Sequence, residues 1–246
     1  FIAKYYNKKN NIFNSIKSEI NSLIFLNKII PSIFPLLKFY SDDLMIINYI
    51  DHNNLKGKNY QEILSKEILK LHLNTSNKYG FNFDSQIGGL RQENKISSNW
   101  VDFFKNQRLN MIFNLINKEN SLPKEINSKI ELLLRDLENR IPKNPVPRLL
   151  HGDLWSGNIL FNNKEFIAFI DPGIYYGHNE LEIAYLTWFN YIDKDFIKFY
   201  SNVINVNKDY YNYEPIYQLY FSLLNVHLWD RNYILNVEAL LKKLRL

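Results

Sequence analysis

Apolar and polar positions change over short distances in the first part of the chain. Residues 1–6 place apolar and aromatic side chains around one lysine, which predicts a strand. Apolar residues then recur at helical spacing within residues 10–28. The apolar runs 36–40 and 44–50 flank Ser41-Asp42-Asp43, which predicts a hairpin. This part of the chain is therefore expected to be β-rich with one helix.

Helical periodicity dominates from Tyr60 onward. Apolar residues between Ile63 and Leu71 predict a helix that ends near Asn77. The stretch that contains Gly88 and Gly89 is expected to be a loop. Further helices are expected at residues 100–117, 124–140, 180–190, 196–203, 215–227 and 233–244.

One short hairpin is expected within this helical part, from the apolar runs 159–161 and 166–170. The predicted fold class is therefore α+β, with two lobes and a cleft between them. Residues 1–49 form a small β-rich lobe with the lysine strand, the helix and a hairpin that leads to a hinge. Residues 50–246 form a larger, mainly helical lobe.

Composition excludes several classes of function. The chain has no cysteine, so disulfides, thiolate zinc sites and cysteine nucleophiles are excluded, and a cytoplasmic location is expected. The net charge of +5 comes from scattered lysines and arginines without a basic face, which argues against nucleic acid as a partner. No apolar run approaches the ~20 residues that cross a bilayer, and no signal peptide is visible, so no membrane partner is expected.

The segment from His151 to Asn158 carries the clearest chemistry. It reads His-Gly-Asp-Leu-Trp-Ser-Gly-Asn and enters an apolar run. Asp153 followed five residues later by Asn158 has the spacing of a kinase catalytic loop. One carboxylate in such a loop accepts the proton of the acceptor hydroxyl, and a nearby amide oxygen holds a metal ion that neutralises phosphate charge. Asp153 is therefore the candidate base and Asn158 a candidate metal ligand.

A second carboxylate follows the hairpin. Asp171 lies 13 residues after Asn158, in the sequence Ile-Asp-Pro-Gly. Magnesium prefers one or two carboxylates together with phosphate oxygens and water, so Asp171 and Asn158 are candidate ligands of Mg²⁺ beside ATP. The Asp-x4-Asn spacing alone also occurs by chance. Its combination with a His-Gly-Asp loop, two apolar flanks and Asp-Pro-Gly favours a phosphotransferase with a protein-kinase-like fold.

Three places in the small lobe fit the same interpretation. Lys4 lies in the first strand, where a kinase lysine holds the α and β phosphates, and Glu19 on the following helix is placed to pair with it. Taken alone, either residue also fits a surface charge. Backbone groups near Asn48 and Ile50, where the predicted strand enters the hinge, are expected to contact adenine.

These motifs resemble the fructosamine (ketosamine) kinase family, whose relatives include aminoglycoside and choline kinases. The resemblance covers nearly all of the chain. It is most specific in the catalytic loop with its Trp155 and in the segment that follows Asp171. Weaker similarities lie at residues 80–109, thought to link the lobes, and at residues 217–225 of the last long helix.

The resemblance implies transfer of the ATP γ-phosphate to a sugar hydroxyl of a ketoamine, either a small molecule or a glycated protein, which primes the adduct for spontaneous loss. It also implies that Asp153 is the base, that Asn158 and Asp171 hold Mg²⁺, and that Lys4 with Glu19 orders the phosphates. Trp155 would stack against the substrate, although packing beneath the loop is the alternative. His151 would fix the loop through hydrogen bonds, and His178 also fits a purely structural role.

The chain departs from the family pattern in three places. The family's two strands and Gly-rich loop have no counterpart before Phe1, so a chain truncated at its N-terminus is expected, and its affinity for ATP stays an open question. Glu182 stands where the family tends to have Asp, and its longer side chain can still anchor the catalytic loop. Residues 226–230, which read Val-His-Leu-Trp-Asp, replace a more familiar stretch, so the substrate end of the site is expected to differ.

Three alternative functions stay open. An aminoglycoside or choline kinase would need an acidic or aromatic pocket, and the acidic candidates do not form a dense cluster. A non-catalytic, pseudokinase-like binding module is motivated by the missing phosphate loop, but the base and both metal ligands are intact. A protein kinase is disfavoured because Trp155 occupies the place of its catalytic-loop lysine, and no Ala-Pro-Glu follows Asp171.

Overall fold

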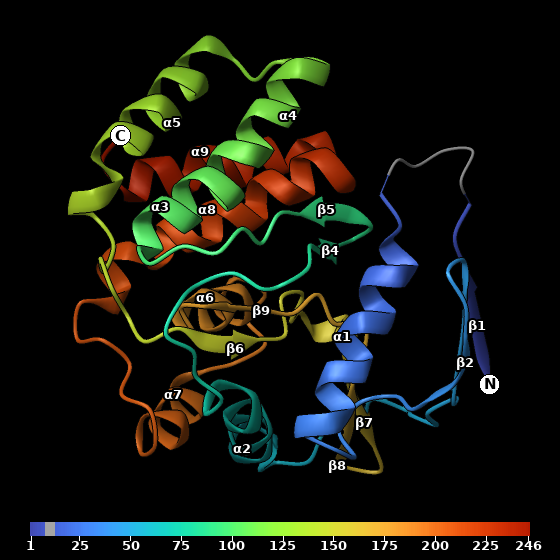
Figure 1. Ribbon diagram of the computed structural model, residues 1–246. Coiled ribbons are helices and arrows are strands. Elements are labelled where there is room, and N and C mark those ends of the chain that lie inside the picture. Colours follow the sequence, from blue (N-terminus) through green and yellow to red (C-terminus); the bar gives the residue numbers. More distant parts are fainter. Residues whose placement is uncertain (8–12) are drawn as a thin grey trace.

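The computed structural model describes residues 1–7 and 13–246. Its N-terminal part is an antiparallel sheet of β1 (Ile2–Tyr5), β3 (Leu44–Ile47) and β2 (Leu37–Tyr40), with β3 in the middle. Helix α1 (Ser15–Ile29) lies beside this sheet (Figure 1) and buries Ile20, Leu23 and Leu26. The predicted strand, helix and hairpin are therefore present.

The start of α1 differs from the prediction because of a cap. The side chain of Asn14 accepts a hydrogen bond from the Lys17 N–H at 2.9 Å, so the helix begins at Ser15. The predicted start at residue 10 lies outside the described residues.

Helices make up most of the remaining chain. Those from the middle of the sequence are α2 (Tyr60–His72), α3 (Trp100–Phe104), α4 (Asn110–Asn120) and α5 (Lys124–Asp136), with a π-helical turn η1 (Lys105–Leu109) before α4 and a 3-10 turn η2 (Leu137–Asn139) after α5. Those from the C-terminal part are α6 (Glu180–Trp188), α7 (Lys194–Ser201), α8 (Tyr210–Leu228), the 3-10 turn η4 (Arg231–Tyr233) and α9 (Ile234–Lys243).

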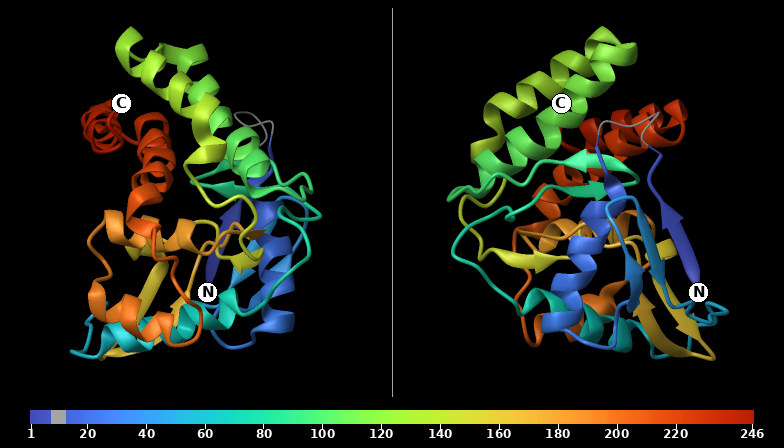
Figure 2. Two further views of the ribbon diagram at one scale, coloured as in Figure 1. Left: turned by 90° about the vertical axis from the view of Figure 1, so that its left-hand side faces the viewer. Right: turned by 45° about the vertical axis from the view of Figure 1, so that its right-hand side comes forward.

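The helices pack around α8, which contacts α4, α6 and α9, while α2 pairs with α7. Figures 1 and 2 show α4 and α5 at one end of the molecule and α2 and α7 at the opposite end. Among the described residues, no helix combines the length and the apolar character that spanning a membrane requires.

Three two-stranded ribbons lie among these helices: β4 (Ser85–Ile87) with β5 (Leu90–Gln92), β6 (Arg148–Leu150) with β9 (Tyr175–Gly177), and β7 (Ile159–Asn162) with β8 (Glu165–Phe169). The β7–β8 hairpin was predicted. The β4–β5 hairpin replaces an expected loop, because Gly88 and Gly89 have φ of +56° and +84° and form its two-residue turn. Ribbon β6–β9 was not predicted, since its strands are far apart in sequence.

Helix α2 ends earlier than its apolar pattern suggested. The side-chain amide of Asn74 donates to the carbonyls of Lys70 and Leu71 at 2.7 and 3.2 Å, which caps the helix after His72 rather than near Asn77. Leu73, the apolar residue that follows, is exposed, so periodicity alone overestimated the length of the helix.

Candidate active site

The predicted catalytic loop, residues 151–158, connects β6 to β7 and is held by close backbone contacts. Gly152 has φ of +87°, and a Cβ added there would lie 1.9 Å from the carbonyl oxygen of Gly173. A Cβ on Gly173 would in turn lie 2.0 Å from the carbonyl oxygen of Gln86 in β4. The Gly173 N–H also donates to the His151 carbonyl at 2.8 Å. These contacts place Asp153 and Asp171 on two loops that touch each other.

Asp153 is buried at 8% exposure, and the amide of Asn158 donates to its backbone carbonyl at 2.8 Å. Burial raises the pKa of the Asp153 carboxyl from 3.8 to about 7, with a smaller upward contribution from the charge of Asp171. A carboxylate whose pKa lies near the working pH is well suited to accept a proton in a reaction.

An ion-pair cluster joins Lys4 and Glu19 to Asp171, which lies 167 positions after Lys4 in the sequence. The Lys4 Nζ lies 2.7 Å from Glu19 Oε1 and 2.6 Å from Asp171 Oδ1. Burial acts to lower the pKa of Lys4, but the two carboxylates outweigh it and hold that pKa above its usual value. The predicted Lys4–Glu19 pair is present, and Lys4 also contacts the carboxylate that was expected to bind metal.

Asn158 and Asp171 are linked through their backbones. The N–H of Ile170 donates to the carbonyl of Asn158 at 3.0 Å, and Asp171 follows in the left-handed region with φ of +57°. The side-chain amide nitrogen of Asn158 donates to the backbone carbonyl of Asp153. The side-chain oxygen of Asn158 therefore faces away from that carbonyl. Within the described residues no group of three His, Cys, Asp or Glu could hold a metal ion.

A mainly apolar pocket of about 200 Å³ lies on the side of Lys4 and Asp171 and includes Ile2, Ile47, Leu160 and Ile170. Asn48, Tyr49 and Ile50, where the hinge was predicted, also line it. Asn48 donates its N–H to the Leu36 carbonyl at 3.2 Å and accepts the Leu36 N–H on its side-chain oxygen at 2.6 Å. The Ile50 N–H has no acceptor among the described residues. Of the two predicted hinge positions, Ile50 therefore has the free donor.

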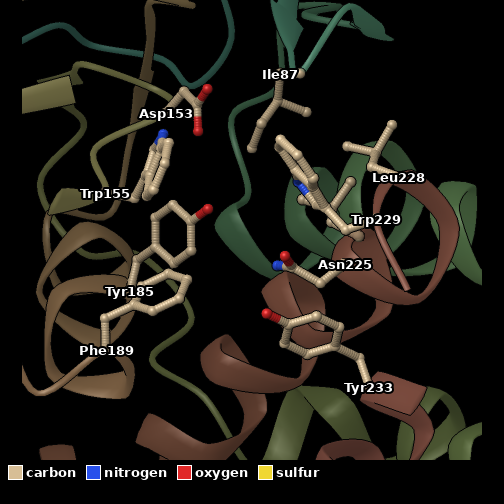
Figure 3. A pocket seen from close by; sticks show the side chains of 11 residues that line it. Ile87, Asp153, Trp155, Tyr185, Phe189, Asn225, Leu228, Trp229 and Tyr233 are labelled. Carbon is tan, nitrogen blue, oxygen red and sulfur yellow. The ribbon is translucent and has the colours of Figure 1, made fainter. Parts of the chain in front are cut away.

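A second pocket, of about 240 Å³, lies on the side of Asp153, and five of its eleven lining residues are aromatic (Figure 3). Trp155 lines it beside Asp153 and also lies over Gly157, where an added Cβ would be 2.4 Å from the indole ring. Both expected roles of Trp155, facing a ligand and packing on the loop, are thus compatible with its position. The sequence had marked residues 226–230, which include Trp229, as an altered substrate end, and residues 217–225, which include Asn225, as similar to the family. It gave no signal for the lining residues Tyr185, Phe189 and Tyr233.

Glu182 anchors the catalytic loop from α6. Its Oε1 accepts the Gly152 N–H at 2.6 Å, and its Oε2 accepts the His72 Nε2–H at 2.9 Å. The Tyr200 hydroxyl accepts from Asn179 at 2.9 Å and lies 2.7 Å from His72 Nδ1, to which it donates. This buried chain of donors and acceptors was not visible in the sequence, where only Glu182 was singled out.

His151 and His178, which the sequence singled out, are both buried. Burial lowers the pKa of His151, whose Nδ1 faces the Asp153 N–H at 3.3 Å and whose ring stacks on Phe34. Burial also lowers the pKa of His178 to about 3, so it is neutral, and its Nδ1 accepts from the Tyr217 hydroxyl at 2.8 Å. Neither histidine lines the aromatic pocket.

Comparison with known proteins places the chain in one family. The model of one protein family, described as fructosamine kinase, matches residues 3–246. A probable ketoamine kinase of Enterococcus faecium is 33% identical over 187 residues, which are 76% of this chain and 68% of that protein. The chloroplastic protein-ribulosamine 3-kinase of Arabidopsis thaliana is 29% identical over 77% of this chain and 58% of that protein. The chain thus spans only part of the curated relatives it matches, 66% in the case of the probable ketoamine kinase of Lactiplantibacillus plantarum.

Solved structures share the fold. A protein of Thermobifida fusca, solved as a candidate fructosamine-3-kinase, superposes with a TM-score of 0.88 at 22% identity, over 98% of this chain and 84% of that one. APH(2″)-IIa in complex with gentamicin superposes with a TM-score of 0.62 at 18% identity, over 97% of this chain and 83% of that one. These likenesses confirm the predicted α+β, protein-kinase-like fold.

Proposed function

Because the chain belongs to the fructosamine kinase family, we propose that it transfers the γ-phosphoryl group of ATP to a sugar hydroxyl of a ketoamine. The observation that carries this proposal is the position of the two pockets relative to the catalytic loop. Asp153 lines the aromatic pocket, whereas Lys4 and Asp171 line the apolar one. A nucleotide in the second pocket and an acceptor in the first would meet at this loop.

The apolar pocket suits the adenine ring. Ile2 and Ile47 come from the sheet, and Leu160 and Ile170 come from the β7–β8 hairpin, so a flat base fits between two aliphatic surfaces. The free Ile50 N–H can donate to a ring nitrogen. Lys4, held by Glu19, is placed to contact the phosphates, as the lysine of a kinase does. The boundary proposed between the lobes falls between Tyr49 and Ile50, and both residues line this pocket.

Asn158 and Asp171 fit Mg²⁺, because both offer oxygen atoms and magnesium completes its octahedron with phosphate oxygens and water. When bound, the ion would supply positive charge to the β and γ phosphates. Lys4 already contacts Asp171 Oδ1 and would move its contact to the phosphates when the nucleotide binds.

Asp153 would act as the base. Its carboxylate takes the proton of the sugar hydroxyl while that oxygen bonds to the γ-phosphorus and the bond from the γ-phosphorus to the ADP oxygen breaks. The contact between Glu182 and the Gly152 N–H keeps the loop in the geometry that this step needs. Phosphorylation of the sugar of a glycated amine or protein would then prime the adduct for loss, so repair of glycation is the role we propose.

The charge of the aromatic pocket argues against a polycationic acceptor. Among the described residues that line it, Asp153 is the one carboxylate, whereas a polycationic aminoglycoside would need several. A purely binding role is disfavoured because the candidate base, both candidate metal ligands and the lysine lie around one loop.

Phosphate transfer from ATP to a panel of acceptors tests this proposal in the full-length protein with Mg²⁺. The panel is fructosyl-lysine, ribulosyl-lysine, choline and kanamycin. We expect turnover of one or both ketoamines and a loss of about 10²- to 10⁴-fold in kcat for Asp153→Asn. A higher kcat/KM for choline or kanamycin would contradict the substrate class. Turnover by Asp153→Asn at the wild-type rate would remove Asp153 from its proposed role.

A further inference from the structure

The aromatic pocket has two walls that face each other (Figure 3). One carries Trp155 of the catalytic loop with Tyr185 and Phe189, and the other carries Trp229 and Tyr233, which follow α8. Trp229 is 73% exposed and belongs to the stretch in which this chain departs from the family pattern. Its large apolar surface is therefore available to a ligand at the rim of the pocket.

Ring contacts support Trp155, Tyr185 and Tyr233, whose ring lies 5.9 Å from that of Trp188, and a backbone hydrogen bond fixes the main chain at Trp229. Tyr185 stacks on Phe221 with ring centroids 3.7 Å apart and planes 7° from parallel. The ring of Trp155 lies 6.3 Å from that of Phe189. The backbone N–H of Trp229 donates to the Asn225 carbonyl at 3.0 Å. A rigid aromatic surface binds a ligand without a large loss of side-chain entropy.

The charged side chains around Trp229 have other partners. Asp230 accepts the Asn232 N–H at 2.8 Å, and Arg231 donates to the carbonyls of Asn120 and Ser121 at 2.9 and 2.7 Å. His227 lies 2.9 Å from Glu119. The described residues that line the pocket include one carboxylate, Asp153, and no lysine or arginine.

We propose that these rings form an aromatic box for the protonated secondary amine of the ketoamine, with Trp229 as a specificity-determining residue. This inference rests on the proposed function. Indole faces attract an ammonium group through their quadrupole, and the attraction is stronger where water is excluded. The box therefore selects adducts whose amine carries an uncharged chain, such as the ε-amine of a peptide-bound lysine or an alkylamine.

The box disfavours adducts of free α-amino acids for the same reason. Their carboxylate lies next to the ammonium group and would enter a pocket whose described lining residues include the carboxyl group of Asp153 and no lysine or arginine. An unpaired charge in an apolar site is costly, so the carboxylate acts against binding.

Kinetics with matched acceptors test the selectivity. Ribulosyl-ethylamine and ribulosyl-glycine differ in the carboxylate beside the amine, and we expect the first to have the lower KM. Trp229→Ala should raise the KM for ribulosyl-ethylamine about fivefold to tenfold with kcat within about twofold. Trp229→Phe should recover most of this loss. Tyr211→Ala, which removes an exposed aromatic ring on α8 that lies outside the pocket, is the control and should leave KM unchanged. An unchanged KM in Trp229→Ala would refute the box.

A binding measurement without ATP separates the box from the reaction. Choline and its neutral isostere 3,3-dimethylbutan-1-ol are titrated by calorimetry into the wild type, Trp229→Ala and Tyr211→Ala. We expect the wild type and Tyr211→Ala to prefer choline at least fivefold and Trp229→Ala to lose most of that preference. Equal binding of both probes by the wild type, or a preference that persists in Trp229→Ala because Asp153 causes it, would overturn the box. A Trp229-dependent preference without phosphorylation of any ketoamine would support the box and reject the proposed function.

Discussion

The buried carboxyl of Asp153 should cost the folded protein stability above neutral pH, and replacing it with Asn should recover that stability. A pKa of about 7 in the folded protein, against 3.8 in the unfolded chain, means that the folded state binds more protons between these pH values. Stability is therefore lost as the pH rises from about 4 to about 7. The full penalty above pH 7 corresponds to about 4 kcal/mol.

The difference between Asp153→Asn and the wild type should therefore depend on pH. Linkage predicts an advantage of the variant of about 2 kcal/mol at pH 5.5 and about 4 kcal/mol at pH 8, a growth of about 2 kcal/mol. These values are upper limits, because the exchange of carboxylate for amide also changes the hydrogen bonds around the loop. The increase in this stability advantage between pH 5.5 and pH 8 is the better test, since contributions that do not depend on pH cancel.

The assay is denaturant unfolding of both proteins at the two pH values, without ATP or Mg²⁺, because a cation beside Asp153 would lower its pKa. Asp171→Asn is a useful comparison, because it removes a charge that raises the pKa of Asp153. An advantage of Asp153→Asn that is equal at pH 5.5 and pH 8 would show that the Asp153 pKa is not raised. The explanation of its suitability as a base would then be wrong.

Other predictions follow from single contacts. Gly152→Ala should destabilise the protein by more than about 3 kcal/mol in thermal unfolding, since its Cβ would meet the Gly173 carbonyl at 1.9 Å. Gly89→Ala, with a similar φ of +84° and nothing within 4 Å, should cost only about 1 kcal/mol; equal losses would refute the contact argument. Tyr200→Phe should cost about 1–3 kcal/mol in denaturant unfolding, because His72 Nδ1 loses its donor, and no loss would argue against that hydrogen bond. Lys4→Met should lower kcat about 10²- to 10³-fold in the phosphate-transfer assay, and an unchanged kcat would remove Lys4 from the phosphate site.

Contiguous motifs account for what was predictable about the site. Asp153, Asn158 and Asp171 occur on two short segments with characteristic spacing, and local turn chemistry places each segment next to an apolar strand. The lysine in the first strand and the glutamate on the first helix were likewise identified by order along the chain, and they form an ion pair at 2.7 Å. The family and the kinase-like fold followed from these residues.

The sequence by itself determined most of the helices, the strands of the first sheet, the β7–β8 hairpin and the chemistry of the loop, because periodicity and spacing are local properties. Only the tertiary structure decided which distant side chains meet. The aromatic box combines Trp155 with residues of α6 and of the segment after α8, and the pair between Lys4 and Asp171 spans 167 positions. A pattern of apolar residues shows that a side chain is buried, but packing selects its partner from many of similar shape. For that reason the sequence marked Trp155 and the stretch 226–230 separately, and only the folded protein showed that they face each other across one pocket.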